Sequence, residues 1–388
     1  MSRASRERTR RPSPHTGQPA WPALALALLI AFAGCAGTLS PTDGTAALAL
    51  RGADVSALER IEQAGGVFRD GGLAGDAIAI LRAHGANAFR IRLFVNPNHE
   101  EVQVNDLEYT VRMARRVKAG GAKLLLDLHY SDTWADPGNQ AAPAAWAGLD
   151  FDALERQVEA YSAGVMTRLK QEGVLPDIVQ VGNEIDGGML WPLGRVSGTE
   201  YDTPAQWDRF TRLLKAGIRG LRGAVGPGDS LRIMLHYSQG GSTGGTQWFF
   251  DHMDASEVRY DLIGLSYYPW WHGTLADLQA NLQAAARRYG RDIMLVETSY
   301  PWRAGGWEAM AANRRAMTWP VSPQGQAQYL RDLLDAVAAL PGHQGAGVIW
   351  WYPEAIQVPG LFVWGGGSLA LFDSSGNILP AASAFGAR

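Results

Sequence analysis

Cysteine is almost absent from this chain, because Cys35 is the only one among 388 residues. A disulfide between two positions of the chain is therefore excluded, and the fold has to be held together by its core. Charged residues are also scarce, at 19%, whereas hydrophobic residues make up 46%. This composition excludes a disordered chain and predicts a large folded domain.

An excess of one charge sign is nearly absent as well, since 35 basic residues face 38 acidic ones and leave a net charge of −3. Five arginines and Glu7 give residues 1–34 a charge of +4, so the remainder carries −7. This acidic remainder offers no evident surface for phosphates, which argues against nucleic acid as a partner. Aromatic residues reach 10%, and their flat rings suit the apolar faces of sugars. Filling the core is the alternative explanation for any one ring.

The apolar run from Ala23 to Ala33 is far shorter than the ~20 residues that span a bilayer. It follows the five arginines and ends in Phe32-Ala33-Gly34-Cys35, which resembles a bacterial lipobox. We therefore predict a signal peptide over residues 1–34, and a lipidated Cys35 with a short tether over residues 35–44. The expected location is the bacterial cell envelope, at the outer membrane or cell surface, with contact to the membrane only through the lipid. Cleavage without lipidation, giving a secreted protein, is the second choice.

The rest of the chain alternates short β-like runs with amphipathic stretches. Eight strands followed by helices predict an α/β fold, a single (β/α)₈ TIM barrel over residues 45–388. A doubly wound sheet is the alternative, but no Gly-x-Gly-x-x-Gly turn follows the first strand. The expected strands are Leu48–Val55, Ala88–Val95, Lys123–Tyr130, Ile178–Gly182, Leu231–Tyr237, Leu262–Tyr268, Ile293–Thr298 and Gly347–Tyr352. The clearest helical stretches are Leu107–Ala119, Phe151–Gln171, Pro204–Leu221, Leu275–Tyr289 and Gly325–Leu340.

Polar side chains gather where these strands end. In a parallel barrel the active site lies at the C-terminal ends of the strands, so we expect these side chains to line one catalytic cleft. Salt bridges or solvated loops could account for any one member, but they account poorly for a set drawn from seven strand ends. The set comprises Arg90, Arg92, Asn96, Asp127, His129, Ser131, Asp132, Trp134, Asn183, Glu184, His236, Tyr267, Tyr268, Glu297, Trp350, Trp351 and Tyr352.

Two of these residues are carboxylates on opposite sides of the predicted barrel mouth. Glu184 ends the fourth strand and Glu297 ends the seventh. Two such carboxylates suit glycoside hydrolysis, in which one protonates the leaving oxygen and the other, in a retaining enzyme, attacks the anomeric carbon from ~5–5.5 Å. The structural alternative is that either glutamate is an ion-pair partner of Arg90 or Arg92.

Longer motifs strengthen this interpretation. They are Arg51-Gly52-Ala53-Asp54-Val55-Ser56, Phe89-Arg90-Ile91-Arg92-Leu93-Phe94-Val95-Asn96-Pro97, Asp127-Leu128-His129-Tyr130-Ser131-Asp132-Thr133-Trp134-Ala135-Asp136-Pro137, Gly182-Asn183-Glu184-Ile185, Leu190-Trp191-Pro192, Ser266-Tyr267-Tyr268-Pro269 and Val296-Glu297-Thr298. Across residues 50 to about 378, the chain resembles the endo-β-1,4-galactanases of glycoside hydrolase family 53. The resemblance implies an endo-acting retaining hydrolase of β-1,4-galactan, as in the side chains of pectin.

The resemblance also implies residue roles. Glu184 would be the general acid/base and Glu297 the nucleophile, with Asn183 holding the sugar's 2-hydroxyl group. Arg90 and a tyrosine would hydrogen-bond Glu297 and keep it ionised, as expected of a nearby cation. Strand parity leaves Tyr267 and Tyr268 open, and we select Tyr267. His236 would lie near the acid/base, and Asp132, Trp134 and Trp351 would line the sugar subsites.

The chain departs from the family pattern after the eighth strand. Family members commonly read Tyr-Trp-Glu-Pro there, whereas this chain reads Trp350-Trp351-Tyr352-Pro353-Glu354-Ala355, so a subsite could differ. Some members bind calcium in nearby loops, but no Asp-x-Asp-x-Asp run or His-Glu-x-x-His motif occurs here, and we predict no metal or other cofactor. We expect a monomer. The alternatives left open are a glycan-capture lipoprotein without activity and a β-1,4-mannanase or xylanase of the same clan.

Overall fold

The computed structural model describes residues 48–387. The predicted signal peptide, the proposed lipidation site Cys35 and the tether lie outside the described residues. Within them, no helix is both long enough and apolar enough to cross a membrane.

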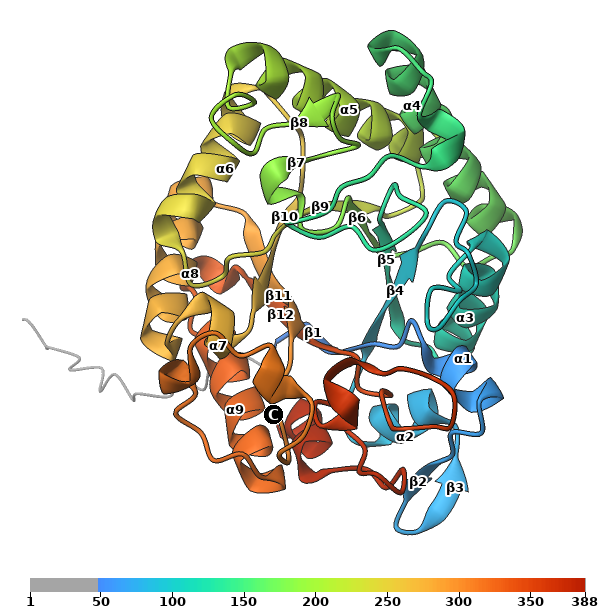
Figure 1. The fold of residues 1–388 in the computed structure, drawn as a ribbon, viewed down its shortest axis with the longest axis vertical. Helices are drawn as coiled ribbons and strands as arrows, with labels where there is room; N and C mark the ends of the chain where they lie inside the picture. Colours follow the sequence, from blue (N-terminus) through green and yellow to red (C-terminus); the bar gives the residue numbers. More distant parts are fainter. Residues whose placement is uncertain (1–47, 388) are drawn as a thin grey trace, which may run out of the picture. The chain divides into compact units, whose positions relative to one another are not determined.

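Eight parallel strands close into a barrel, as Figure 1 shows from one end. Around the barrel their order is β1, β12, β11, β10, β9, β6, β5 and β4, and β4 pairs with β1 to close the circle. The predicted (β/α)₈ fold is thus confirmed, and each predicted strand contains or overlaps an observed one. The observed bounds are β1 Leu50–Asp54, β4 Ala88–Leu93, β5 Lys123–Leu128, β6 Ile178–Val181, β9 Arg232–Tyr237, β10 Leu262–Tyr267, β11 Asp292–Thr298 and β12 Gly345–Trp351.

Helices surround the barrel, and side-chain caps fix where several of them begin. The Asp106, Asp150 and Thr274 side chains accept backbone N–H groups at the starts of α3, α4 and α8, and these three helices have the predicted bounds. The α-helices are α1 Leu58–Gln63, α2 Ala77–Ala83, α3 Leu107–Ala119, α4 Phe151–Gln171, α5 Pro204–Gly223, α6 Thr243–Ala255, α7 Pro269–His272, α8 Leu275–Tyr289 and α9 Pro323–Ala338.

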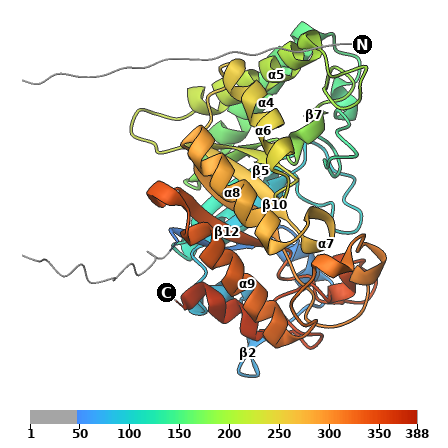
Figure 2. The same cartoon turned by 90° about the vertical axis from the view of Figure 1, so that its left-hand side faces the viewer.

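Two short hairpins and several 3₁₀ turns decorate the connections. The hairpins pair β2 Phe68–Asp70 with β3 Leu73–Gly75, and β7 Gly188–Met189 with β8 Gly194–Arg195. The 3₁₀ turns are η1 Ala144–Trp146, η2 Ile185–Gly187, η3 Trp307–Ala309, η4 Arg314–Ala316, η5 Pro341–His343, η6 Trp364–Gly367 and η7 Pro380–Gly386. Figure 2 shows α7 and β7, which follow the C-terminal ends of β10 and β6, on the same side of the molecule.

The barrel interior is filled by two layers of side chains that differ in chemistry. We call the first the apolar layer: Ala88, Leu125, Ile178, Met234, Leu262, Met294, Val296, Ala346 and Ile349 form one buried cluster. We call the second, toward the C-terminal strand ends, the polar layer: Asp54, Arg90, Asp127, Gln180, His236, Ser266 and Glu297. Residues at the alternate strand positions, such as Phe89, Ile91 and Leu124, pack outward against the helices in the main hydrophobic core. The barrel is therefore a packed core that becomes polar at its mouth.

Candidate active site

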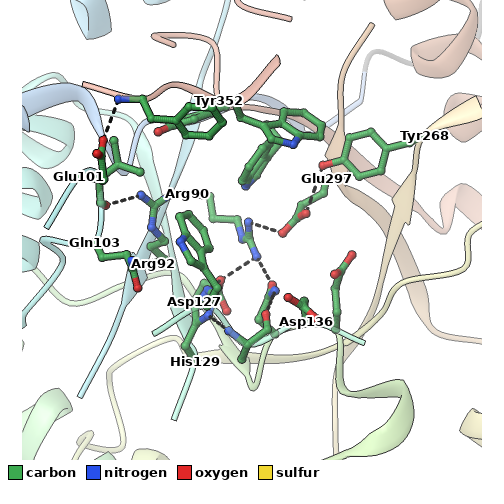
Figure 3. A pocket seen from close by; sticks show the side chains of 18 of the residues that line it. Arg90, Arg92, Glu101, Gln103, Asp127, His129, Asp136, Tyr268, Glu297 and Tyr352 are labelled. Atoms are coloured by element: carbon green, nitrogen blue, oxygen red, sulfur yellow. Dashed lines mark hydrogen bonds and ion pairs between the residues drawn. The ribbon is translucent and has the colours of Figure 1, made fainter. Parts of the chain in front are cut away.

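A cavity of about 420 Å³ opens above the polar layer. Six of the nine residues with a role predicted from the sequence line it, namely Arg90, Trp134, Asn183, Glu184, Glu297 and Trp351. Figure 3 shows this cavity with Glu297, Arg90 and Tyr268 joined by dashed interactions. The strand ends thus bring both candidate carboxylates to one site, as expected for a parallel barrel.

Glu297 reaches the cavity because β11 is irregular. The pairing of β10 with β11 shifts register, so that Leu265 pairs with Leu295 but Ser266 pairs with Glu297. Such irregularities often redirect a side chain beside an active site. Without this shift, Glu297 would lie on the opposite face from Val296, which belongs to the apolar layer. Glu297 is only 6% exposed at the cavity floor.

Arg90 holds Glu297 in place and is itself held by other carboxylates. Its Nη1 lies 2.8 Å from Glu297 Oε1 and 2.9 Å from Asp54 Oδ2, and its Nη2 lies 2.8 Å from Asp127 Oδ2. Nη2 also donates to Asn183 Oδ1 at 2.8 Å. Glu297 therefore does pair with Arg90, as the structural alternative required, but it lines the cavity at the same time. An ion pair that faces a cavity is compatible with a reacting carboxylate.

Glu184 is placed by a tight turn after β6. Gly182 has φ +84° and Glu184 has φ +45°, a left-handed conformation that non-glycine residues adopt at a cost of about 1–3 kcal/mol. At Gly182 a Cβ would also lie 2.5 Å from Ile185 Cγ2. The turn directs the Glu184 carboxylate toward β10, where the Ser266 hydroxyl donates to Oε1 at 2.6 Å. One of the two candidate catalytic residues thus has a strained backbone.

The electrostatics distinguish the two carboxylates. Burial, then the negative charge of Glu297, raises the pKa of Glu184 well above its ordinary value. Burial also raises the pKa of Glu297, to about 7, but the neighbouring Arg90 cation opposes this rise. Glu297 is therefore the first of the two to lose its proton, and Glu184 is the one that retains it.

The selection of Tyr267 is wrong, because Tyr268 is the tyrosine that faces the site. The Tyr268 hydroxyl donates to Glu297 Oε2 at 3.2 Å, whereas the Tyr267 hydroxyl donates to the Gly273 carbonyl. Tyr267 continues the outward-facing positions of β10 and stacks on Tyr329. The neighbouring Ser266 points inward, so Tyr268, two residues later, does so as well.

Two further predicted residues do not line the cavity. Asp132 joins two loops by accepting the backbone N–H groups of Asn96 and Ala144, each at 2.9 Å. In the same motif, Asp136 lines the cavity instead. His236 is fully buried beneath it, with Nδ1 3.3 Å from the Glu184 backbone nitrogen. His236 thus lies near the candidate acid/base, as expected, but it contacts the backbone of Glu184 and not its carboxylate.

Aromatic rings form one wall of the cavity. Trp134 and Trp351 lie 6.3 Å apart and Trp351 and Trp364 lie 4.6 Å apart, between ring centroids. The Arg92 guanidinium lies 4.3 Å from the Trp134 ring centroid, a cation–π contact. Other lining residues that the sequence did not single out are Glu101, Val102, Gln103, Trp271, Phe362 and Trp364. Trp271 lies on α7 and Trp364 on η6, and the others lie in the loops that follow β4 and β12, where no strand-end pattern marks them.

The altered motif after β12 has a structural counterpart. Tyr352 lines the cavity where the family pattern commonly has a glutamate, and Glu354 is buried outside the lining set. Within residues 48–387, no group of three or more His, Cys, Asp or Glu side chains is placed to hold a metal ion. The absence of a cofactor remains a prediction.

The fold and the site define a class of protein: a barrel glycosidase, with two carboxylates and an aromatic wall at the mouth of a parallel barrel. The model of glycosyl hydrolase family 53 matches residues 50–385. A Niallia circulans protein is 44% identical over 86% of this chain and 92% of its own, and the endo-β-1,4-galactanase of Bacillus subtilis is 33% identical over 80% and 71%. The catalytic domain of an Ignisphaera aggregans family 53 enzyme superposes with a TM-score of 0.81, at 31% identity, over 89% of this chain and 98% of that one. The chain belongs to glycosyl hydrolase family 53.

Proposed function

We propose that this glycosidase cleaves β-1,4-galactan internally and with retention of anomeric configuration. The observation that carries the proposal is the asymmetric carboxylate pair: Glu297 bound to Arg90 and Tyr268, and Glu184 with a strongly raised pKa in the same cavity. The galactan substrate is supported by the family match and by the named galactanase among its relatives.

In the proposed mechanism, Glu184 donates its proton to the glycosidic oxygen as Glu297 attacks the anomeric carbon from the opposite face. The leaving oxygen takes the proton, and a covalent glycosyl ester forms on Glu297. Glu184, now ionised, removes a proton from water, which attacks the same carbon and releases Glu297. Two inversions give net retention. Asn183 lines the same cavity, and we assign to it the contact with the sugar's 2-hydroxyl group.

Aromatic side chains support a polysaccharide substrate. Trp134, Trp351 and Trp364 offer faces and edges on which sugar rings can pack, beyond the two carboxylates. A cavity with such a wall suits a chain of several sugars better than a single one. We expect the products to be short galacto-oligosaccharides. The reaction as written needs no metal or other cofactor, and a single barrel supplies every residue that it uses.

Digestion of linear galactan by the full chain tests the proposal. The wild type should release oligosaccharides whose newly formed reducing ends are initially β-anomers by NMR, and it should leave mannan and xylan intact. Glu297→Gln should still bind galactan but should lose activity by about 10⁴-fold, since it removes the nucleophile. Binding without cleavage by the wild type would instead support a glycan-capture protein. Activity on mannan or xylan alone would reject galactan as the substrate.

We further propose export and anchoring through Cys35, supported by the arginine-rich start, the short apolar run and the lipobox-like sequence. The acyl chain would keep the enzyme at the cell envelope, where polymeric substrate is accessible. Mass spectrometry of the mature N-terminus distinguishes a lipidated Cys35 from an unmodified, secreted product. We expect the mature enzyme to act as a monomer.

A further inference from the structure

Ser266 on β10 carries a buried hydroxyl group and lies close to both candidate catalytic carboxylates. It is fully buried, and its backbone pairs in register with Glu297. Its Oγ lies 2.6 Å from Glu184 Oε1 and 2.9 Å from His236 Nε2. Ser266 begins the Ser266-Tyr267-Tyr268-Pro269 motif, but that motif alone assigns no role to its hydroxyl group. The direction of its hydrogen bonds decides what it does to Glu184.

The tautomer of His236 sets that direction. The backbone N–H of Glu184 points at Nδ1 from 3.3 Å, and this donor cannot be reoriented. Gln180 Nε2 also lies 3.1 Å from Nδ1. Asn183 Oδ1 is 3.1 Å from the same atom but already accepts from Arg90 Nη2. Nδ1 is therefore an acceptor without a proton, and the proton of the neutral ring lies on Nε2.

His236 stays neutral because of its surroundings. Burial, followed by the positive charge of Arg90, holds the pKa of His236 well below its ordinary value. The other ionisable groups that face it are Asp127, His129 and His272. Of these, Asp127 acts in the opposite direction, but it does not outweigh burial.

A neutral His236 with its proton on Nε2 donates to Ser266 Oγ. The single hydrogen of the serine hydroxyl is then free for one partner, and the acceptor within reach is Glu184 Oε1. A donor aimed at a carboxylate favours its ionised form and strengthens it as an acid. The same bond holds the carboxylate in one orientation as its charge changes.

We propose that Ser266 is a positioning residue that orients Glu184 and makes it a stronger acid, through a hydroxyl whose direction His236 fixes. The inference rests on the proposed role of Glu184 as acid/base. His236 and Ser266 act together as a short relay, which ends on the proton-transferring carboxylate and does not touch the sugar.

Three charged groups that face Glu184 act in the opposite direction to Ser266. Glu297, Asp186 and Asp136 are carboxylates, and their negative charges disfavour ionisation of Glu184. Ser266 is the one hydrogen-bond donor that opposes them among the interactions of the described chain that shift this group. Loss of the hydroxyl should therefore raise the pKa of Glu184 further, which gives the proposal a definite sign.

The test is Ser266→Ala in the full chain, followed through the pH dependence of kcat/KM on galactan. The alkaline limb of this profile reports the pKa of the acid Glu184 in the free enzyme. We expect that limb to move upward by about one pH unit, which corresponds to the loss of ~1.4 kcal/mol of interaction with a charged group. At the pH optimum of the wild type, kcat/KM should fall by about tenfold. An activated aryl galactobioside, whose leaving group departs without protonation, should lose less than about twofold.

Two further variants keep the test decisive. Ser266→Thr retains the hydroxyl and should restore the wild-type limb, and Ser266→Cys, with its weaker S–H donor, should give an intermediate shift if the alanine variant does not fold. Ser162→Ala is the matched control, because Ser162 on α4 is an equally buried serine bonded to Tyr130, away from the cavity. It should lose stability without any change in the pH profile.

The outcomes separate this inference from the proposed function. If the wild type does not cleave galactan, the proposed function fails, and the inference about Ser266 fails with it. If it does, an unmoved alkaline limb in Ser266→Ala, with equal losses on galactan and on the activated substrate, overturns the inference and leaves a structural serine. A shifted limb with loss on galactan alone supports it.

Discussion

On four strands, the apolar and polar layers of the barrel interior lie one inward-facing position apart. On β4, Ala88 precedes Arg90, and on β9, Met234 precedes His236. Two residues along a strand span about 6.6 Å, so a single step separates a dry core from an ionic network. Two further strands repeat this change, with Leu125 and Asp127 on β5 and Ile178 and Gln180 on β6, whereas on β10 Gly264 lies between Leu262 and Ser266.

The two layers contribute differently to the folded state. The apolar layer is stabilising, because it removes aliphatic side chains from water. In the polar layer, one cation, Arg90, contacts three carboxylates, Asp54, Asp127 and Glu297, so buried negative charge is in excess. Burying charges costs free energy even when they are paired. The difference teaches that stability and chemistry are separated along each strand, and substitutions in either layer can test this separation.

Arg90→Met should have the largest effect. It leaves three buried carboxylates without their cation and removes the charge that favours ionised Glu297. We expect kcat/KM on galactan to fall by about 10³-fold and the free energy of unfolding by about 3–5 kcal/mol. Steady-state kinetics and urea denaturation measure the two losses. Arg90→Lys keeps the charge but cannot contact all three carboxylates. It should therefore recover part of the lost kcat/KM and part of the lost unfolding free energy. Unchanged kinetics with lower stability would make this part of the polar layer structural.

Met234→Ala probes the layer below and should affect stability almost alone. Met234 is fully buried and packs against the Gly264 backbone region. The cavity left behind should cost about 2–5 kcal/mol in unfolding free energy, measured by urea denaturation. The pH profile of kcat/KM should coincide with that of the wild type at a temperature where both are folded. A shifted profile would show that the two layers are mechanically coupled and would break the comparison.

Much of this architecture can be predicted from the sequence, because strands and helices differ in period and because caps mark helix starts. Asp150 and Thr274 begin helices whose observed bounds match the prediction. The strand-end rule likewise places Glu184, Glu297 and Arg90 at one mouth. Helices α1, α2, α6 and α7 are not among the predicted ones, and α5 and α9 differ from the prediction by two residues at one or both ends.

The facing of individual side chains is harder to predict, for a physical reason. Both faces of a barrel strand are buried, so the alternation that separates inside from outside in a half-exposed strand is missing. On β10, Tyr267 and Tyr268 are both aromatic and both buried, and no pattern assigns one of them to the cleft. On β11, the register shift before Glu297 changes parity without a signal in the sequence. Loop residues such as Asp132 and Asp136 depend on turns that local sequence does not fix.

Glu354→Gln should have the smallest effect and should sharpen the comparison at the edge of the polar layer. Glu354 is fully buried, its Oε1 accepts the Ala57 backbone N–H, and burial, then the charge of Asp54, raises its pKa to about 8. The native state therefore prefers the neutral form, whereas an unfolded glutamate ionises near pH ~4.3. Its contribution to stability is complete below that pH and is lost as the pH rises toward 8.

Glutamine imitates the neutral carboxyl group and cannot ionise, so the variant should not share this loss. Relative to the wild type, the unfolding free energy of Glu354→Gln should rise by about 2–3 kcal/mol between pH 5 and pH 7, measured by urea denaturation at each pH. Replacement of the exposed Glu200 by glutamine is the control for removing a carboxylate from the surface. A constant difference between variant and wild type would show that Glu354 is ionised in the native state. The buried network would then hold one more negative charge than the polar layer contributes by itself.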